Sequence, residues 1–284
     1  MAFLFSVKNI HKLGEKVEGS KLTILGARGS VPVSGKNYHV YGGATSCVLL
    51  ETPYGAFIFD GGSGLLNLPQ RVWKENKKIH LFLSHFHLDH LLGISMCPMM
   101  YEEDVEIIFY GEKKNKIKEA LDKMMQLPLG PIGTEAFLSK VSYVGLEENY
   151  EIPDTKVKIK TLSNTHPGGS LAYRFFWDEK SVVYATDCEI NKQGMKRMEE
   201  FGKDADLIVL DAQYTKEEYE KCKGFGHTCI ETSVAVIVAS GAKQGMLYHH
   251  APNHTDKQLE NMENNLKGKW GHISFAKEGD TVTL

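Results

Sequence analysis

The densest group of reactive side chains lies between residues 85 and 90. The apolar run from Ile79 to Leu83 is followed by His85, His87, Asp89 and His90, in the string His-Phe-His-Leu-Asp-His. Imidazole and carboxylate groups are common ligands of divalent metal ions. Side chains two residues apart on an extended chain leave it on one face, so His85 and His87 can bind one ion. Asp89 and His90 follow after a bend, which favours a second ion close to the first.

Two plainer explanations fit this cluster less well. Histidines can gather by chance on a solvated loop, but an HxHxDH string is a rare coincidence at this composition. A single structural zinc ion is usually bound by cysteines in CxxC spacing, and the chain has no such pair. The spacing therefore favours a hydrolytic site with two metal ions.

The HxHxDH string, together with later motifs in the expected order, resembles the metallo-β-lactamase superfamily. The later motifs are Asn164 to Gly169, Tyr184 to Asp187 and Leu247 to His250. Within the superfamily, Ile208 to Tyr214 and Gly226 to Thr228 resemble the ribonuclease Z and cyclic-nucleotide phosphodiesterase branch. The resemblance spans nearly the whole chain and implies an α/β fold, a four-layer αβ/βα sandwich.

The resemblance also implies a ligand set for two divalent metal ions. His85, His87 and His166 would bind the first ion, Asp89, His90 and His249 the second, and Asp187 would bridge them. The family favours zinc, although hard carboxylate ligands and the absence of cysteine ligands leave manganese or iron as alternatives.

His249 and His250 compete for one ligand position. Adjacent side chains at a strand end point to opposite sides, so only one of them can face the metals. Counting from the preceding strand favours His249, and His250 would then lie behind the ligands or face the substrate. His254, on the following loop, is expected at the surface.

Three further residues are candidates for orienting or proton-transfer roles. By the same resemblance, Asp211 holds the tautomer of His227, and His227 contacts the phosphate or protonates the leaving oxygen. The alternative for His227 is a simple helix cap. Asp60 is expected either to orient a metal ligand or to cap a turn.

Two glycine-rich loops, Gly26 to Ser30 and Tyr41 to Ser46, follow or precede strands. Neither matches a nucleotide-binding motif, because the first lacks the GxGxxG spacing and the Walker lysine. We expect them to shape the backbone near the site, with Arg28 as a possible phosphate contact.

Composition limits the choice of substrate and compartment. The 284 residues carry a net charge of −3, which gives no general attraction to long nucleic acids. Five scattered cysteines argue against a disulfide framework and favour the cytoplasm, and no signal peptide or membrane span is evident. We expect a single domain over residues 1–284, with an N-terminal extension over 1–20. Enzymes of this branch are commonly dimers, so a homodimer is also expected.

Hydrophobic periodicity predicts strands and helices that would position these residues. Strands are expected at 22–25, 46–51, 56–59, 79–83, 105–110, 157–162, 171–177, 182–185, 207–210 and 246–248. Helices are expected after the capping residues Thr215 and Thr255 and over His227 to Ser240, closed by Gly241. Residues 111–140 form a lysine-rich helix and a proline- and glycine-rich excursion, which lies over the site mouth, meets a partner subunit or is a plain connection.

These patterns predict a dinuclear metal-dependent hydrolase. The expected reaction is hydrolysis of a small phosphodiester such as a cyclic nucleotide by a metal-bridging hydroxide that Asp89 helps to orient. A ribonuclease Z-like endonuclease acting at the tRNA 3′ end is the main alternative, but the chain lacks a long basic arm of the kind that grips RNA. A thioester, lactone or β-lactam hydrolase and a metal-binding scaffold protein without turnover are the remaining alternatives.

Overall fold

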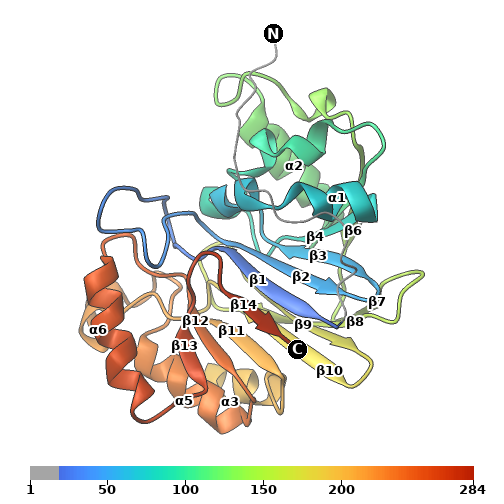
Figure 1. Cartoon of the computed structure of the whole chain (residues 1–284). Coiled ribbons are helices and arrows are strands. Elements are labelled where there is room, and N and C mark those ends of the chain that lie inside the picture. Colours follow the sequence, from blue (N-terminus) through green and yellow to red (C-terminus); the bar gives the residue numbers. More distant parts are fainter. Residues whose placement is uncertain (1–18) are drawn as a thin grey trace.

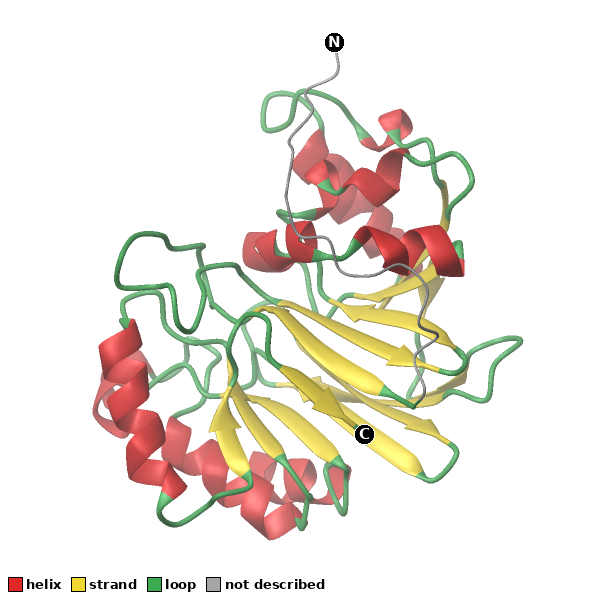
Figure 2. Ribbon diagram, in the orientation of Figure 1, coloured by secondary structure: helices red, strands yellow, loops and turns green. Residues whose placement is uncertain are grey.

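In the computed structural model, which describes residues 19–284, the strands form two seven-stranded sheets (Figures 1 and 2). The first sheet contains, in spatial order, β14 (Thr281–Thr283), β1 (Lys21–Gly26), β2 (Cys47–Thr52), β3 (Gly55–Phe59), β4 (Lys78–Phe82), β5 (Glu106–Gly111) and β6 (Lys140–Gly145). The second contains β13 (Ile273–Phe275), β12 (Gly245–Tyr248), β11 (Leu207–Asp211), β10 (Lys180–Ala185), β9 (Ser170–Trp177), β8 (Lys158–Asn164) and β7 (Asn149–Glu151).

The helices lie outside the two sheets (Figure 2). They are α1 (Gln70–Asn76), α2 (Lys114–Met125), α3 (Lys192–Phe201), α4 (Lys216–Cys222), α5 (Ile230–Ser240) and α6 (Asp256–Lys267). Short 3₁₀ helices lie in the connections: η1 (Ser63–Asn67), η2 (Leu88–His90), η3 (Ile94–Met96), η4 (Pro98–Tyr101) and η5 (Thr134–Ala136).

Three apolar clusters hold the layers together. Between the sheets, aromatic side chains of both sheets pack directly, as in the stacked rings of Phe59 and Tyr184, whose centroids lie 5.0 Å apart. Helices α1 and α2 cover the outer face of the first sheet through residues such as Trp73 and Leu121. Helices α3, α5 and α6 cover the outer face of the second sheet. The four-layer αβ/βα sandwich expected from the sequence is therefore confirmed.

Most expected elements are present. Each of the ten expected strands overlaps an observed one, and Thr215 and Thr255 form capping boxes at the starts of α4 and α6. The expected start of a helix at His227 is wrong, since α5 begins at Ile230 after Cys229. The Thr228 N–H donates to Asp211 Oδ1 at 2.9 Å, which keeps this segment in extended backbone before the helix.

Two segments that the sequence set apart are the N-terminal extension and residues 111–140. The extension over residues 1–20 lies outside the described residues except for its last two positions. In residues 111–140, α2 is followed by turns and η5, and Leu127 and Leu129 are exposed.

Parallel pairing brings the expected site residues to one edge. Phe59 of β3 pairs with Phe82 of β4 in the first sheet. Leu210 of β11 pairs with both Ala185 of β10 and Leu247 of β12 in the second sheet. Because the carboxyl ends of parallel strands meet at the same edge, the loops after these strands converge there.

Candidate metal centre

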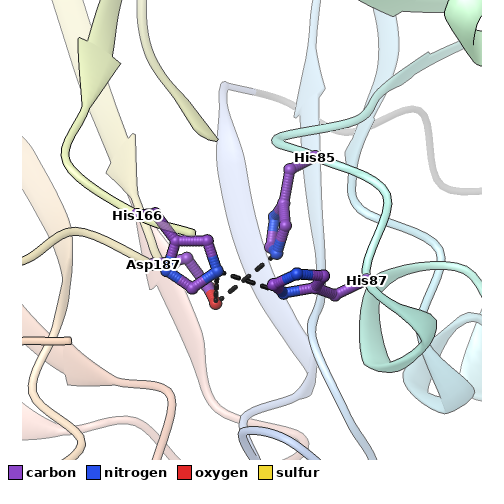
Figure 3. Close-up of side chains that lie close together, drawn as sticks. All are labelled: His85, His87, His166 and Asp187. Carbon is purple, nitrogen blue, oxygen red and sulfur yellow. Dashed lines mark hydrogen bonds and ion pairs between the residues drawn. The ribbon is translucent and has the colours of Figure 1, made fainter. Parts of the chain in front are cut away.

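Four of the predicted ligands gather in what we call the outer ligand set (Figure 3). It consists of His85, His87, His166 and Asp187, each of which offers a ligand atom within 4.8 Å of the others. His85 Nε2 and His166 Nε2 lie 3.7 and 3.6 Å from Asp187 Oδ1, and His166 Nε2 lies 3.1 Å from His87 Nδ1. Their nitrogens point toward one another around the carboxylate (Figure 3).

The remaining predicted ligands form the inner ligand set, which consists of Asp89, His90 and His249. His90 Nε2 lies 3.2 Å from both Asp89 Oδ2 and Asp187 Oδ2. His249 Nε2 lies 3.3 and 3.2 Å from the same two oxygens. Asp187 thus turns Oδ1 toward the outer set and Oδ2 toward the inner set, as a bridging carboxylate requires.

The charge of the site fits two bound cations. Asp60, Asp89, Asp187 and Asp211 are each at most 5% exposed. Within residues 19–284 no lysine or arginine forms an ion pair with them, and their ion-pair partners are histidines. The buried His85 Nε2 and His90 Nε2 have no hydrogen-bond partner. Since buried charges are costly unless they are compensated, this donor set suits divalent metal ions.

Electrostatics show how strongly the carboxylates draw positive charge. Burial opposes the ionisation of Asp187, but His249 and His90 outweigh it and hold its pKa well below the usual range. Burial alone would lower the pKa of His90, yet Asp187 and Asp60 raise it well above the usual value. Positive charge is therefore favoured where His90 Nε2 meets Asp187.

A buried carboxylate fixes the ring of His90. His90 Nδ1–H donates to Asp60 Oδ2 at 2.8 Å, and Asp60 also accepts from Ser84 N, Ser84 Oγ and Tyr184 OH at 2.7, 2.8 and 2.8 Å. His249 Nδ1 is fixed in the same way by Gln213 Oε1 at 2.8 Å. Such partners set which nitrogen faces the metal.

Sequence reasoning proposed Asp60 for this position but missed Ser84, Tyr184 and Gln213. Ser84 directly precedes the HxHxDH string, and Gln213 follows Asp211 by two residues, so their closeness to the motifs is a signal that could have identified them. Tyr184 opens the motif Tyr184 to Asp187, but its place on a strand does not reveal its partner, because its hydroxyl reaches Asp60 across the two sheets.

The structure separates the two adjacent histidines. His249 adopts a left-handed backbone conformation, with φ 65°, and its ring lies in the inner set. His250 points to the other side, where its Nε2 donates to the Ala276 carbonyl at 2.8 Å, and burial lowers its pKa to about 3. The expectation that His254 is a surface residue is wrong, because it is 1% exposed and contacts Glu218.

Asp211 and His227 form a second buried couple. His227 Nδ1–H donates to Asp211 Oδ2 at 2.8 Å, and the same carboxylate accepts the Asp187 N–H at 3.0 Å. Burial lowers the pKa of His227, but Asp211 outweighs it, so the pKa is raised. Together with Asp187 and His249, these two residues also form a group whose ligand atoms are close enough to hold an ion. Their direct bond occupies Nδ1 and favours the role of a couple over that of ligands.

The first glycine-rich loop supports the inner set. Ser30 N donates to Asp89 Oδ2 at 2.8 Å. A Cβ at Gly29 would lie 2.4 Å from His249 Nδ1, so only glycine allows this approach. Arg28 does not face the site, because it is fully buried and donates to the carbonyls of Gly42 and His254 at 2.8 and 2.7 Å.

These groups border an open pocket with a volume of ≈ 310 Å³. Its lining residues are Ser30, His87, Leu88, Asp89, Asp187, His227 and His249. None of these comes from residues 111–140, so the lid role of that segment stays a prediction. No helix among the described residues has the length and apolar character needed to cross a membrane.

Comparison with known proteins identifies the superfamily to which the chain belongs. Residues 57–250 match the model of the Beta-lactamase superfamily domain. The chain therefore belongs to the β-lactamase superfamily of metal-dependent hydrolases, and its similarities support the ribonuclease Z and phosphodiesterase-like branch predicted from the sequence.

The individual relatives have low sequence identity to this chain. A ribonuclease Z from Thermoplasma volcanium is 21% identical over 254 residues, which cover 70% of this chain and 79% of that protein. Among solved structures, the metallo-β-lactamase fold protein YhfI from Bacillus subtilis has 18% identity and a TM-score of 0.71, over 93% of this chain and 98% of that one.

Two other solved structures share the fold at similar distance. A diphosphatase from the PhnP family has 18% identity and a TM-score of 0.68, over 93% of this chain and 98% of that one. Yeast PDE1 has 15% identity and a TM-score of 0.66, over 94% of this chain and 99% of that one.

Proposed function

We propose that this protein is a dinuclear phosphodiesterase that hydrolyses a small phosphodiester such as a cyclic nucleotide. The observation that carries the proposal is the placement of the Asp211–His227 couple beside both ligand sets. His227 lines the same pocket as Asp89, Asp187 and His249. The two metal ions, zinc by family preference, would stabilise the charge on the phosphate and acidify a water molecule.

The side chains of the pocket divide the remaining work. Asp211 fixes the tautomer of His227 by accepting from Nδ1–H, so that Nε2 is the atom that can exchange a proton with substrate. His227 is proposed to protonate the departing oxygen. Asp89, held by the Ser30 N–H, is proposed to orient the attacking water.

The main competing function is that of a tRNA 3′ endonuclease. It is favoured by the similarity to a ribonuclease Z over most of the chain. We prefer a small substrate because the chain has a net charge of −3 and lacks a long basic arm that would hold RNA away from the cut.

An assay of the metal-loaded protein tests the proposal. Bis(p-nitrophenyl) phosphate, a panel of cyclic mononucleotides, a precursor tRNA and nitrocefin would be compared, with metal content measured for each preparation. We expect turnover of the first two. Cleavage restricted to the tRNA would favour the competing function, and loss of all phosphodiester turnover with metals bound would overturn the proposal.

The role of His227 has its own test. His227→Ala should slow hydrolysis of a cyclic nucleotide by about 100-fold or more with metal content unchanged, because an alkoxide leaving group needs a proton. The loss should be much smaller for bis(p-nitrophenyl) phosphate, since p-nitrophenolate departs without protonation. Equal losses on both substrates, or loss of metal, would contradict the role of acid.

A further inference from the structure

Two large exposed apolar side chains belong to segments that border the pocket. Leu88, inside the HxHxDH string, lines the pocket and is 57% exposed. Phe225 lies two residues before His227 and is 61% exposed. Exposed apolar surface next to a polar site is typical of a surface that contacts a ligand.

The loop that carries Phe225 is held firmly. The Glu189 carboxylate accepts the N–H groups of Gly224 and Gly226 at 2.9 and 3.1 Å and the hydroxyl of Tyr219 at 3.0 Å. Phe225 N also donates to the Cys222 carbonyl at 3.0 Å. The backbone on both sides of Phe225 is therefore fixed, and its side chain is presented in an ordered loop.

The same loop contacts the outer ligand set. His166 Nδ1–H donates to the Gly226 carbonyl at 3.0 Å. A Cβ at Gly226 would lie 2.2 Å from His166 Nδ1, so only glycine permits this approach. Phe225 is thus one residue from a contact with a predicted metal ligand and two from the proposed acid.

We propose that Phe225, assisted by Leu88, binds a planar aromatic group attached to the phosphate of the substrate, either a nucleobase or a simple aryl ring. This inference rests on the proposed phosphodiesterase function and specifies its substrate class. An aromatic ring offers a stacking surface for any base or aryl group, and such contacts change affinity by about 5- to 150-fold.

Three diesters with the same p-nitrophenolate leaving group test the proposal. They are the methyl, phenyl and thymidine 5′ esters of p-nitrophenyl phosphate, and the measured quantity is kcat/KM relative to the methyl ester. The wild-type protein should prefer the ring-bearing esters. Phe225→Ala should lower that preference about tenfold, Phe225→Tyr should retain it, and Leu88→Ala should lower it less.

A matched control and a binding measurement complete the design. Leu129→Ala removes an exposed leucine that does not line the pocket and should keep the preference. The fluorescence of Phe225→Trp should respond to phenylphosphonate at lower concentration than to methylphosphonate. A drop in preference for the thymidine ester alone would identify a nucleobase, and a drop for both would identify any planar ring.

The outcomes separate this inference from the proposed function. Lack of turnover of all three esters by wild type would count against phosphodiesterase activity itself. Turnover without preference, or a preference that survives Phe225→Ala, would overturn the inference alone. A dimer that dissociates on Phe225→Ala with the preference intact would assign Phe225 to a contact between two copies of the chain, and would also overturn it.

Discussion

The two ligand sets differ in how the protein surrounds them. Every residue of the inner set is at most 5% exposed, and its histidines are oriented by Asp60 and Gln213. In the outer set His87 is exposed, and the histidine partners are the Ser84 hydroxyl and the Gly226 carbonyl. The Asp60 carboxylate therefore bonds directly to a histidine of the inner set, whereas the histidines of the outer set bond directly to buried neutral groups.

This difference has consequences for metal exchange. A hydrogen bond from a histidine to a carboxylate increases the basicity of the ring and restricts its orientation, which strengthens metal binding. Burial also slows access of water and chelators. We therefore expect the inner ion to be retained longer, while the outer ion, beside the exposed His87, exchanges more readily.

The largest effect should follow a change in the ligand that the sets share. Asp187→Asn keeps the volume of the side chain but removes the charge that both oxygens present to the two sets. Metal analysis should show weakened binding at both positions, and turnover should fall by about three orders of magnitude. Asp178→Asn, an exposed aspartate, is the control and should bind two ions. Loss of only one ion in Asp187→Asn would contradict its bridging role.

The second-largest effect should distinguish His249 from His250, since only one of them is a predicted ligand. His249→Ala should lose the inner ion. His250→Ala should keep both ions and lower the free energy of unfolding by about 1–3 kcal/mol, because it leaves the Ala276 carbonyl without its donor. Elemental analysis and thermal unfolding of the two variants measure these outcomes. Metal loss in the second variant alone would reverse the assignment.

A smaller effect is expected from the support of the inner set. Asp60→Asn should weaken the inner ion by about 10- to 100-fold and leave the outer ion nearly unchanged. Competition with a chromophoric chelator measures both affinities. Equal weakening of the two ions would mean that Asp60 supports the whole fold of the site and has no selective effect.

The smallest effect should follow a change in Gln213, which orients His249 in the inner set. Gln213→Ala should weaken the inner ion by about tenfold, because the lost acceptor is a neutral amide. Gln213→Glu restores an acceptor and should recover the affinity. Failure of this variant to recover it would argue that Gln213 acts by packing alone.

Sequence reasoning predicted much of the fold because its signals are local. The runs that became β3, β4, β10, β11 and β12 are apolar and bounded by polar residues, and the capping boxes at Thr215 and Thr255 depend on residues three positions apart. Strand β6 and the three-residue strands β7, β13 and β14 were missed. The three short strands are defined by the neighbours they pair with, which the local sequence does not reveal. Strand β6 lies at the edge of its sheet and pairs with β5.

The candidate site divides in the same way. The nine residues named from motifs come together at one edge of the sheets, since strand ends place them there. The partners Ser84, Tyr184 and Gln213 and the burial of His254 depend on contacts between distant segments. The contact from Tyr184 to Asp60 joins residues 124 positions apart, and no spacing rule predicts it.

Removal of metal from the fully loaded protein tests the account most directly. Elemental analysis should find two divalent ions per chain, and a chelator should remove them in two phases. The slow phase should become fast in Asp60→Asn, while the fast phase keeps its rate. A stoichiometry of one ion, or a single phase that Asp60→Asn leaves unchanged, would contradict a site built from two unequal ligand sets.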